Sequence, residues 1–561
     1  MHNKINGRMK TMSKVFGIIA AVGLSGVALS ACGQKAAAAS NQNISVGIAS
    51  EIQMLDPVHD VDTTSSEIIG NTEEGLVTMG KQNKAEPGIA KSWTKSKDGL
   101  TYTFNLRHDA KWNDGTPVTA QDFVYGWRRG VDPKTAAENA YLFSGIKNAD
   151  AIIANKKDPD QLGIQANGKY QVTVTLEHPI SYFEQLVQSA IFLPQEQKVV
   201  QKYGKKYGTD ATKVAYDGPY TIKKWNGSGD SWTLTKNNHY WNPNNVHLNQ
   251  VTYQVVKESS TGLNMFESGQ IDQTTLIGNQ VQNEKNNKSY TKVASGSNYF
   301  VQLNQKSPSS TILKKAFNNV DIRKALSLSI DRQSFVNNTL NDGSTAALGI
   351  VTTGMGQNPS GGEDFAKAAY VKNDADSGVN YNIALAKQLW AKGMKEIGAT
   401  SLNVTLTADD DDTHDTIVQY LQNAWTKNLK GMRVTVRKVP KTTRVKYLQT
   451  GNFDAIISGW SPDYSDPSTF LDMFTTGNSY NFGDYSNSKF DADMKTADNT
   501  ADAKTRWNAM VNAEQTLMKD QGVIPLYQLS TSYLRNTKLK NVIINPAGGN
   551  PGWRGVYLAN K

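Results

Sequence analysis

Cysteine is nearly absent from this sequence: among 561 residues, Cys32 is the only one. A single cysteine cannot form an internal disulfide, and a redox thiol pair or a cysteine-based zinc site would need more. The sequence also lacks His-x-x-x-His, Gly-x-Ser-x-Gly, the phosphate loop Gly-x-x-x-x-Gly-Lys-Ser/Thr and the dinucleotide motif Gly-x-Gly-x-x-Gly. We therefore expect no catalytic residue, no metal site and no cofactor.

A strong excess of one charge sign is lacking as well. The formal net charge is +9, and it falls to +5 once residues 1–31, with four basic and no acidic side chains, are set aside. Over a chain of this length, such a charge gives little reason to expect nucleic-acid binding. It suits an acidic cell-envelope surface.

The N-terminus has the pattern of an export signal. Its four basic residues flank the start of an apolar run of 15 residues, 15–29, which is too short for a comfortable membrane span. The segment Leu29-Ser-Ala-Cys32 resembles a bacterial lipobox, which implies removal of residues 1–31 and lipid attachment to the Cys32 sulfur. The alternative is a plain secretory signal with an incidental cysteine.

Residues 32–43 follow this segment and are rich in Ala and Ser. Such a composition is typical of a flexible tether. We therefore expect a lipid-anchored protein on the extracytoplasmic face of the cell membrane, and the long tether favours a Gram-positive surface.

The length of the chain predicts two or three domains. Residues 100–106 alternate apolar and polar side chains, which predicts a half-buried strand. Asn113-Asp-Gly-Thr-Pro117 is a turn signal, and Thr119 with Asp122 has the spacing of a helix cap and its acidic partner. We also expect strands at 44–48 and 170–176 and a short helix at 67–76.

From residue 381 onward, helical and strand patterns alternate. Helices are expected at 381–394, 415–428, 442–449 and 501–517, and strands at 402–406, 432–436, 453–458 and 523–526. The order strand–helix–strand–helix–strand predicts a parallel sheet with crossover helices. The expected fold class is therefore α/β.

Asp463 follows the third strand of this unit, in a turn rich in Pro, Asp and Ser, with Trp460 and Tyr464 beside it. In open α/β sheets, ligands bind beyond the carboxyl ends of the strands. The alternative is a surface turn whose aspartates cap the local backbone. We assign this role of a turn residue to Asp466, which precedes Pro467.

His414 opens the helix after the strand at 402–406, so it lies at the carboxyl end of a neighbouring strand. It is either a ligand-binding residue or a structural surface histidine. The preceding Asp409-Asp-Asp-Asp412 lacks the glycine and the distal glutamate of a calcium loop. We interpret these aspartates as helix caps and dipole partners.

Five blocks of the sequence resemble one family. The longest is Asp98-Gly-Leu-Thr-Tyr-Thr-Phe-Asn-Leu-Arg-His-Asp-Ala-Lys-Trp-Asn-Asp-Gly-Thr-Pro-Val-Thr-Ala-Gln-Asp-Phe-Val-Tyr125. The others are Gly218-Pro-Tyr-Thr-Ile222, Asn238-His-Tyr-Trp-Asn242, Asp321-Ile-Arg-Lys-Ala-Leu-Ser-Leu-Ser-Ile-Asp-Arg332 and Gly459-Trp-Ser-Pro-Asp-Tyr464. Together they resemble the family 5 solute-binding proteins of ABC importers, and within them the oligopeptide-binding lipoproteins of the OppA type.

The resemblance implies a three-lobed fold of the class II (cluster C) periplasmic-binding-protein type, with the ligand enclosed between lobes. It divides the chain into a discontinuous lobe I (44–74, 200–302 and 528–561), an inserted lobe II (75–199) and a lobe III (303–527). Two connections, near residues 299–302 and 526–528, would form the hinge.

In this family the aspartate at the position of Asp463 pairs with the α-ammonium of the peptide, and Trp460 and Tyr464 would line the first peptide pockets. The resemblance places His414 at the other end of the peptide, and we expect the aromatic residues Tyr141, Tyr299 and Tyr527 to contact peptide as well. Ile457 and Lys441 stand where some relatives carry an arginine and a tryptophan. A weaker clamp on the peptide C-terminus would suit longer peptides.

The resemblance thus implies a monomeric lipoprotein that captures oligopeptides and delivers them to the permease subunits of an ABC transporter. A receptor for a peptide pheromone is the first alternative. Binding of another solute, such as a dipeptide, murein peptide, nickel, haem or sugar, is also open because a fold does not fix its ligand. An exported hydrolase is disfavoured by the missing catalytic motifs.

Overall fold

The computed structural model describes residues 42–81, 84–547 and 552–559. The expected signal peptide, Cys32 and nearly all of the expected tether lie outside the described residues. None of the helices in the described ranges combines the length and the apolar character that a membrane span requires.

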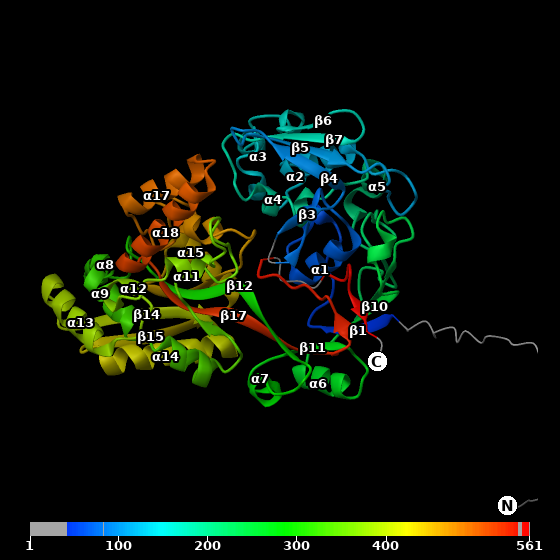
Figure 1. Ribbon diagram of the computed structural model, residues 1–561. Coiled ribbons are helices and arrows are strands. Elements are labelled where there is room, and N and C mark those ends of the chain that lie inside the picture. The colour runs from blue at the N-terminus through cyan, green and yellow to red at the C-terminus, as the bar shows by residue number, and fades with distance from the viewer. Residues whose placement is uncertain (1–41, 82–83, 548–551, 560–561) are drawn as a thin grey trace, which may run out of the picture. The chain divides into compact units, whose positions relative to one another are not determined.

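In the described part of the chain, the largest sheet has eleven strands (Figure 1). Its strands run in the order β15 (Met432–Val439), β14 (Leu402–Asp409), β16 (Ala455–Trp460), β12 (Tyr290–Leu303), β17 (Ile524–Arg535), β11 (Gln273–Leu276), β1 (Asn43–Ile48), β10 (Gln250–Val255), β9 (Ser231–Lys236) and β8 (Tyr220–Lys223), with β13 (Thr345–Ala346) paired to β17. This sheet carries the elements that position the candidate site.

The two long strands β12 and β17 pair antiparallel and lie side by side in the middle of this sheet (Figure 1). The predicted short strand at 523–526 was wrong in length, because β17 continues to Arg535. Beyond Tyr527 its buried positions are mostly polar, including Gln528 and Ser532. The apolar run therefore ends before the strand does. The two expected hinge connections lie on these two strands.

The predicted parallel arrangement is confirmed: β14 pairs in parallel with both β15 and β16. We call residues 383–520 the parallel unit. Its helices are α13 (Ile383–Ile397), α14 (Asp412–Asn428), α15 (Lys441–Thr450), α16 (Ser468–Leu471), α17 (Ser488–Asn499) and α18 (Ala503–Asp520). Helix α14 begins earlier than expected because Asp411 caps it by accepting a hydrogen bond from the backbone N–H of His414 at 2.9 Å.

A separate four-stranded antiparallel sheet organises residues 90–192, which we call the small-sheet unit. Its strands run in the order β4 (Ala90–Lys95), β5 (Thr101–Leu106), β7 (Gln171–Thr175) and β6 (Ile164–Ala166). Helix α2 (Ala120–Val131) begins at the predicted cap, where Asp122 accepts from the backbone N–H of Thr119 at 2.7 Å. The fully buried Phe104 and Trp127 belong to the hydrophobic core of this unit.

The remaining strands of the large sheet, β1 and β8 to β10, have their own core beneath α1 (Thr63–Thr72). The helix expected at 67–76 begins at Thr63 instead, because Asp62 caps it through the backbone N–H of Ser65 at 2.9 Å. Other helices that support the sheets are α5 (Gln197–Tyr203), α6 (Ser259–Glu267), α7 (Asn279–Glu284), α8 (Thr311–Asn318) and α9 (Val320–Leu328).

Two of the conspicuous sequence blocks, 98–125 and 238–242, have a structural role around the buried residue Glu74. Its carboxylate accepts from the Tyr240 hydroxyl and from Trp241 Nε1, each at 2.6 Å, and pairs with Arg554 at 3.2 Å. The guanidinium of Arg107 lies 3.5 Å from the centroid of the Trp241 ring. Blocks 98–125 and 238–242 therefore meet beside one buried carboxylate, through the contact of Arg107 with Trp241.

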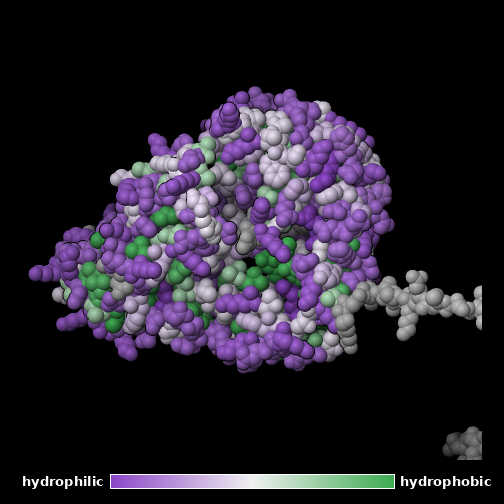
Figure 2. Space-filling model, viewed as in Figure 1, coloured by the Kyte–Doolittle hydropathy of each residue, from purple (hydrophilic) through white to green (hydrophobic). Residues whose placement is uncertain are grey.

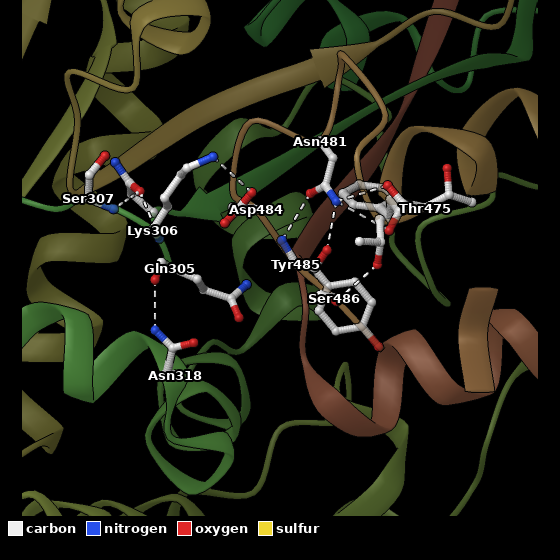
Figure 3. A network of polar contacts seen from close by, with 12 residues as sticks. Gln305, Lys306, Ser307, Asn318, Thr475, Asn481, Asp484, Tyr485 and Ser486 are labelled. Carbon is white, nitrogen blue, oxygen red and sulfur yellow. Dashed lines mark hydrogen bonds and ion pairs between the residues drawn. The ribbon is translucent and has the colours of Figure 1, made fainter. Parts of the chain in front are cut away.

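A polar network fastens the loop after residue 474 to the loop after β12 (Figure 3). The Asn481 amide donates to the backbone carbonyls of Thr475 and Tyr485, at 3.1 and 2.7 Å. Lys306 pairs with Asp484 at 3.6 Å. These contacts end on backbone carbonyls or on an opposite charge, so the network fixes loops and is not the candidate site.

Candidate functional site

The predicted site residues fall into two groups, and the strands that lead to Asp463 and His414 end at one edge of the large sheet. Because β14 and β16 are parallel, the segments that contain His414 and Asp463 leave the sheet at the same edge. The antiparallel strand β12 places Tyr299 opposite Gly459, and β17 places Tyr527 opposite Tyr299. In Figure 2 the visible surface is hollowed between the positions that Figure 1 gives to β12 and α1.

Asp463 is a partly buried carboxylate that faces Tyr141, a residue on a short 3-10 helix (Ala140–Phe143). Burial raises the pKa of its carboxyl to about 6, against a hydrogen bond from the Tyr141 hydroxyl that lowers it. Tyr141 belongs to the small-sheet unit and keeps 41% of its surface exposed. Neither cause of the shift is a cation, so at neutral pH this carboxylate carries a negative charge that burial disfavours.

Tyr464, the next residue, is covered on one ring face. Its ring stacks on the ring of Tyr182 with centroids 4.2 Å apart and an interplanar angle of 2°. Tyr182 comes from the small-sheet unit. Trp460, at the end of β16, donates from Nε1 to the Thr469 hydroxyl at 3.2 Å and meets Tyr480 edge-on at 5.2 Å.

Asp466 has the capping role expected of it and one more. It accepts from the backbone N–H of Ser468 at 3.0 Å, and it binds the Arg506 guanidinium through two hydrogen bonds of 2.7 and 2.8 Å. The bidentate pair fixes the end of the loop to α18.

His414 lies in a second group, at the end of β14. The alternative of a surface histidine is wrong, because only 5% of His414 is exposed. Its Nδ1 lies 2.8 Å from Asp411 and its Nε2 lies 3.8 Å from Asp409. Arg444 Nε donates to Asp409 at 2.7 Å, and both side chains are buried. The interpretation of Asp411 as a helix cap is confirmed by its bond to the His414 backbone.

Asp409, Asp411 and His414 offer three ligand atoms close enough together to hold a metal ion. The buried Arg444 already supplies positive charge to Asp409. A metal would have to compete with that ion pair, so the geometry gives no reason to revise the expectation of a site without metal.

Tyr299 and Tyr527 form an aromatic stack next to this group. Their ring centroids are 5.1 Å apart, and the Tyr299 ring meets His414 edge-on at 5.5 Å. Tyr527 is fully buried, and within the described residues its hydroxyl has no hydrogen-bond partner. These three predicted residues therefore form one group, separate from the group of Asp463, Tyr464 and Tyr141.

A cavity of about 360 Å³ lies beside the long strands and was not anticipated from the sequence. Asn298, Ser344 and Gln528 contribute to its wall. In the described part of the chain, Asn298 Oδ1 and Ser344 Oγ are buried there without a hydrogen-bond partner. Such a wall can accept water or the polar groups of a ligand.

The sequence also gave no indication of Tyr182 or Arg444. Both contacts join residues far apart in the chain, and neither residue stands in a recognisable motif. The sequence offers only a general rule here: a buried aspartate needs a cation or a hydrogen-bond donor as a partner.

Comparison with known proteins identifies one family of binding proteins that this chain matches. The family model of the bacterial extracellular solute-binding proteins, family 5, matches residues 84–482 through the part described as its middle. A dipeptide-binding protein of Lactococcus lactis subsp. cremoris is 39% identical over 497 residues, which are 87% of this chain and 88% of the relative.

Solved structures are similar over nearly the whole chain. OppA of Listeria monocytogenes bound to peptide has a TM-score of 0.74 and 36% identity, and the match covers 93% of this chain and 100% of that one. The pheromone receptor PrgZ has a TM-score of 0.75 and 33% identity, with the same two coverages. The expected α/β fold of the class II binding-protein type is thereby confirmed, while the exact lobe boundaries stay a prediction.

Proposed function

Since the chain belongs to the bacterial extracellular solute-binding proteins of family 5, we propose that it captures oligopeptides outside the cell and delivers them to the permease of an ABC importer. The observation that carries this proposal is Asp463. It is a carboxylate at the carboxyl edge of parallel strands, partly buried, with no protein cation among the causes of its raised pKa in the described residues.

The α-ammonium of a peptide fits this carboxylate. Every unmodified peptide has one, so a carboxylate anchor can register peptides of different length and sequence. A buried charge without its counter-ion is costly, and an incoming ammonium removes that cost. We expect the first side chains of the peptide to lie near Trp460, Tyr464 and Tyr141.

The His414 group gives the other end of the site a different character. Arg444 and Asp409 already neutralise each other, and His414 is hydrogen-bonded to Asp411. A peptide carboxylate would find no uncommitted cation within this group of residues. This supports the expectation of a weaker clamp on the peptide C-terminus, which would suit longer peptides.

The proposal includes a membrane anchor. We infer that Cys32 carries lipid after removal of residues 1–31, on the sequence pattern alone, because these residues lie outside the described ranges. A tethered, monomeric receptor next to its permease would raise the local concentration of captured peptide.

Two measurements test the peptide function. Mass spectrometry of ligands that co-purify with the protein should show peptides with free N-termini. Calorimetry should then show that Asp463→Asn weakens peptide binding by about 2–5 kcal/mol, because the ammonium loses its charged partner. Unchanged affinity would remove Asp463 as the anchor, and purified protein that binds no peptide at all would overturn the function.

A second function is favoured by the similarity to the pheromone receptor PrgZ. Such a receptor would bind one peptide sequence and not a mixture. The same mass spectrometry separates the two: a mixture of sequences supports nutrient uptake, and one dominant sequence supports signalling.

A further inference from the structure

The loop between β16 and α16 is held at its ends and in its middle by different parts of the fold. At its start, the Ser461 hydroxyl contacts the Ser297 hydroxyl of β12 at 2.8 Å. At its end, Asp466 is bound to Arg506 of α18. Both holding residues lie on elements of the large sheet or the parallel unit.

The middle of this loop is held from the small-sheet unit instead. Asp463 receives its hydrogen bond from Tyr141, and Tyr464 stacks on Tyr182. Tyr464 also contacts the Ser468 hydroxyl at 3.4 Å, but the contact that covers its ring face depends on the small-sheet unit lying against the parallel unit.

Tyr182 contacts more of the loop than Tyr464 alone. The guanidinium of Arg506 lies 5.5 Å from the centroid of the Tyr182 ring, within the range of a cation–π contact. The same guanidinium binds Asp466, and its side chain is only 7% exposed. One ring therefore touches both a middle residue of the loop and the cation that fixes the end of the loop.

We propose that Tyr182 is a positioning residue for Asp463: it orients the anchor by stacking on the adjacent Tyr464, and it does so across the contact between the two units. This rests on the proposed function, in which Asp463 binds the peptide ammonium. A charged hydrogen bond to an ammonium depends on direction as well as on charge. Loss of the ring should therefore weaken recognition of the ammonium more than it weakens recognition of the rest of the peptide.

The test compares one peptide in two forms, with a free N-terminus and with an acetylated one, by calorimetry on the whole mature chain. In the wild-type protein the free form should bind at least about thirtyfold more tightly. In Tyr182→Ala this ratio should fall by about tenfold, whereas Tyr182→Phe, which keeps the ring, should stay within about twofold of the wild type.

Tyr170→Ala is the matched control. Tyr170 also stacks on a neighbour, His108, in the small-sheet unit, with centroids 4.3 Å apart. The partners of its ring are His108 and Lys169, neither of which belongs to the loop, so its removal should leave the ratio unchanged. Tyr182→Leu, which fills more of the space than alanine, provides a second test should Tyr182→Ala fail to fold, and it should lower the ratio as well.

The outcomes are distinct. A ratio that falls in Tyr182→Ala and Tyr182→Leu but not in Tyr182→Phe supports the positioning role. A ratio that stays at the wild-type value in both alanine and leucine variants overturns it, even if both forms bind more weakly, because Tyr182 would then stabilise the fold only. If the wild-type protein itself does not distinguish the two forms, the anchor assignment fails rather than the role of Tyr182.

Discussion

The Tyr141 hydroxyl, on a short 3-10 helix of the small-sheet unit, is the hydrogen-bond partner that lowers the pKa of the Asp463 carboxyl. The bond satisfies one part of the carboxylate, but burial still raises its pKa to about 6. The protein thus maintains a charge that the folded state solvates poorly. A buried charge that lowers the stability of the fold is typical of residues selected for function rather than for stability.

Replacing Asp463 by asparagine should therefore stabilise the ligand-free protein. Asparagine removes the charge and keeps an acceptor for Tyr141. A folded pKa of about 6 against an ordinary value of 3.8 means that ionisation destabilises the folded state, increasingly as pH rises from about 4 to 6 and constantly above. We expect the free energy of unfolding to rise by about 1–3 kcal/mol at pH 7.

Urea denaturation of both proteins at pH 7 and at pH 4.5 measures this effect. The gain should shrink to about a third at pH 4.5, where Asp463 is protonated in the folded protein. A variant that is less stable than the wild type at pH 7 would show that Asp463 also has a structural role.

Peptide affinity should fall below pH 6. The ammonium needs the ionised form of Asp463, so the protonated fraction of the free protein is lost for binding. With a pKa of about 6, the affinity at pH 5 should be about tenfold lower than at pH 7, provided that the peptide itself does not titrate in this range. Calorimetry with an alanine-based peptide measures this directly.

Asp463→Asn is the control for this pH dependence, because asparagine does not titrate. Its residual binding should vary little between pH 5 and pH 7. An equal loss in both proteins would assign the pH dependence to another group.

The sequence was informative where local patterns decide the structure. The alternation of strand and helix after residue 381 predicted the parallel strands, and the carboxyl-edge rule then placed Asp463 and His414 at one edge. Capping chemistry predicted the start of α2 at Thr119. These features depend on residues within a few positions of one another.

The rest depends on contacts between distant residues. No local pattern pairs Tyr182 with Tyr464 or Arg444 with Asp409. The first contact depends on how two units pack, and the second on how α15 packs against the end of β14. The length of β17 was missed for a related reason. Its inward positions carry Gln528 and Ser532, which are satisfied by neighbouring strands that the sequence does not show.

Amidation of the peptide C-terminus should have little effect on affinity. Beside β14, Arg444 and His414 are paired with aspartates. Arg437 donates to the Thr407 hydroxyl and to the backbone carbonyl of Asn452, so its guanidinium is already hydrogen-bonded as well. We expect a peptide with a free C-terminal carboxylate and its amide to bind within about threefold of each other. Any ion pair of that carboxylate would be exposed, and an exposed ion pair contributes about 1 kcal/mol or less. N-acetylation of the same peptide serves as the positive control. A loss of more than about tenfold on amidation would reveal a cationic clamp elsewhere.

Removal of Arg444 should destabilise the fold more than removal of its ion pair. In Arg444→Met, Asp409 would be left as a buried carboxylate, with His414 Nε2 at 3.8 Å as the nearest basic group of this cluster. We expect a loss of about 3–5 kcal/mol in the free energy of unfolding, because an uncompensated buried charge costs more than the pair contributes. Asp409→Asn in the same protein should recover much of that loss.

Lys438→Met breaks the more exposed pair with Asp415 and should cost less than about 1 kcal/mol. Equal losses in the single Arg444 variant and the double variant would mean that Arg444 stabilises α15 by packing, and that Asp409 does not depend on it for charge.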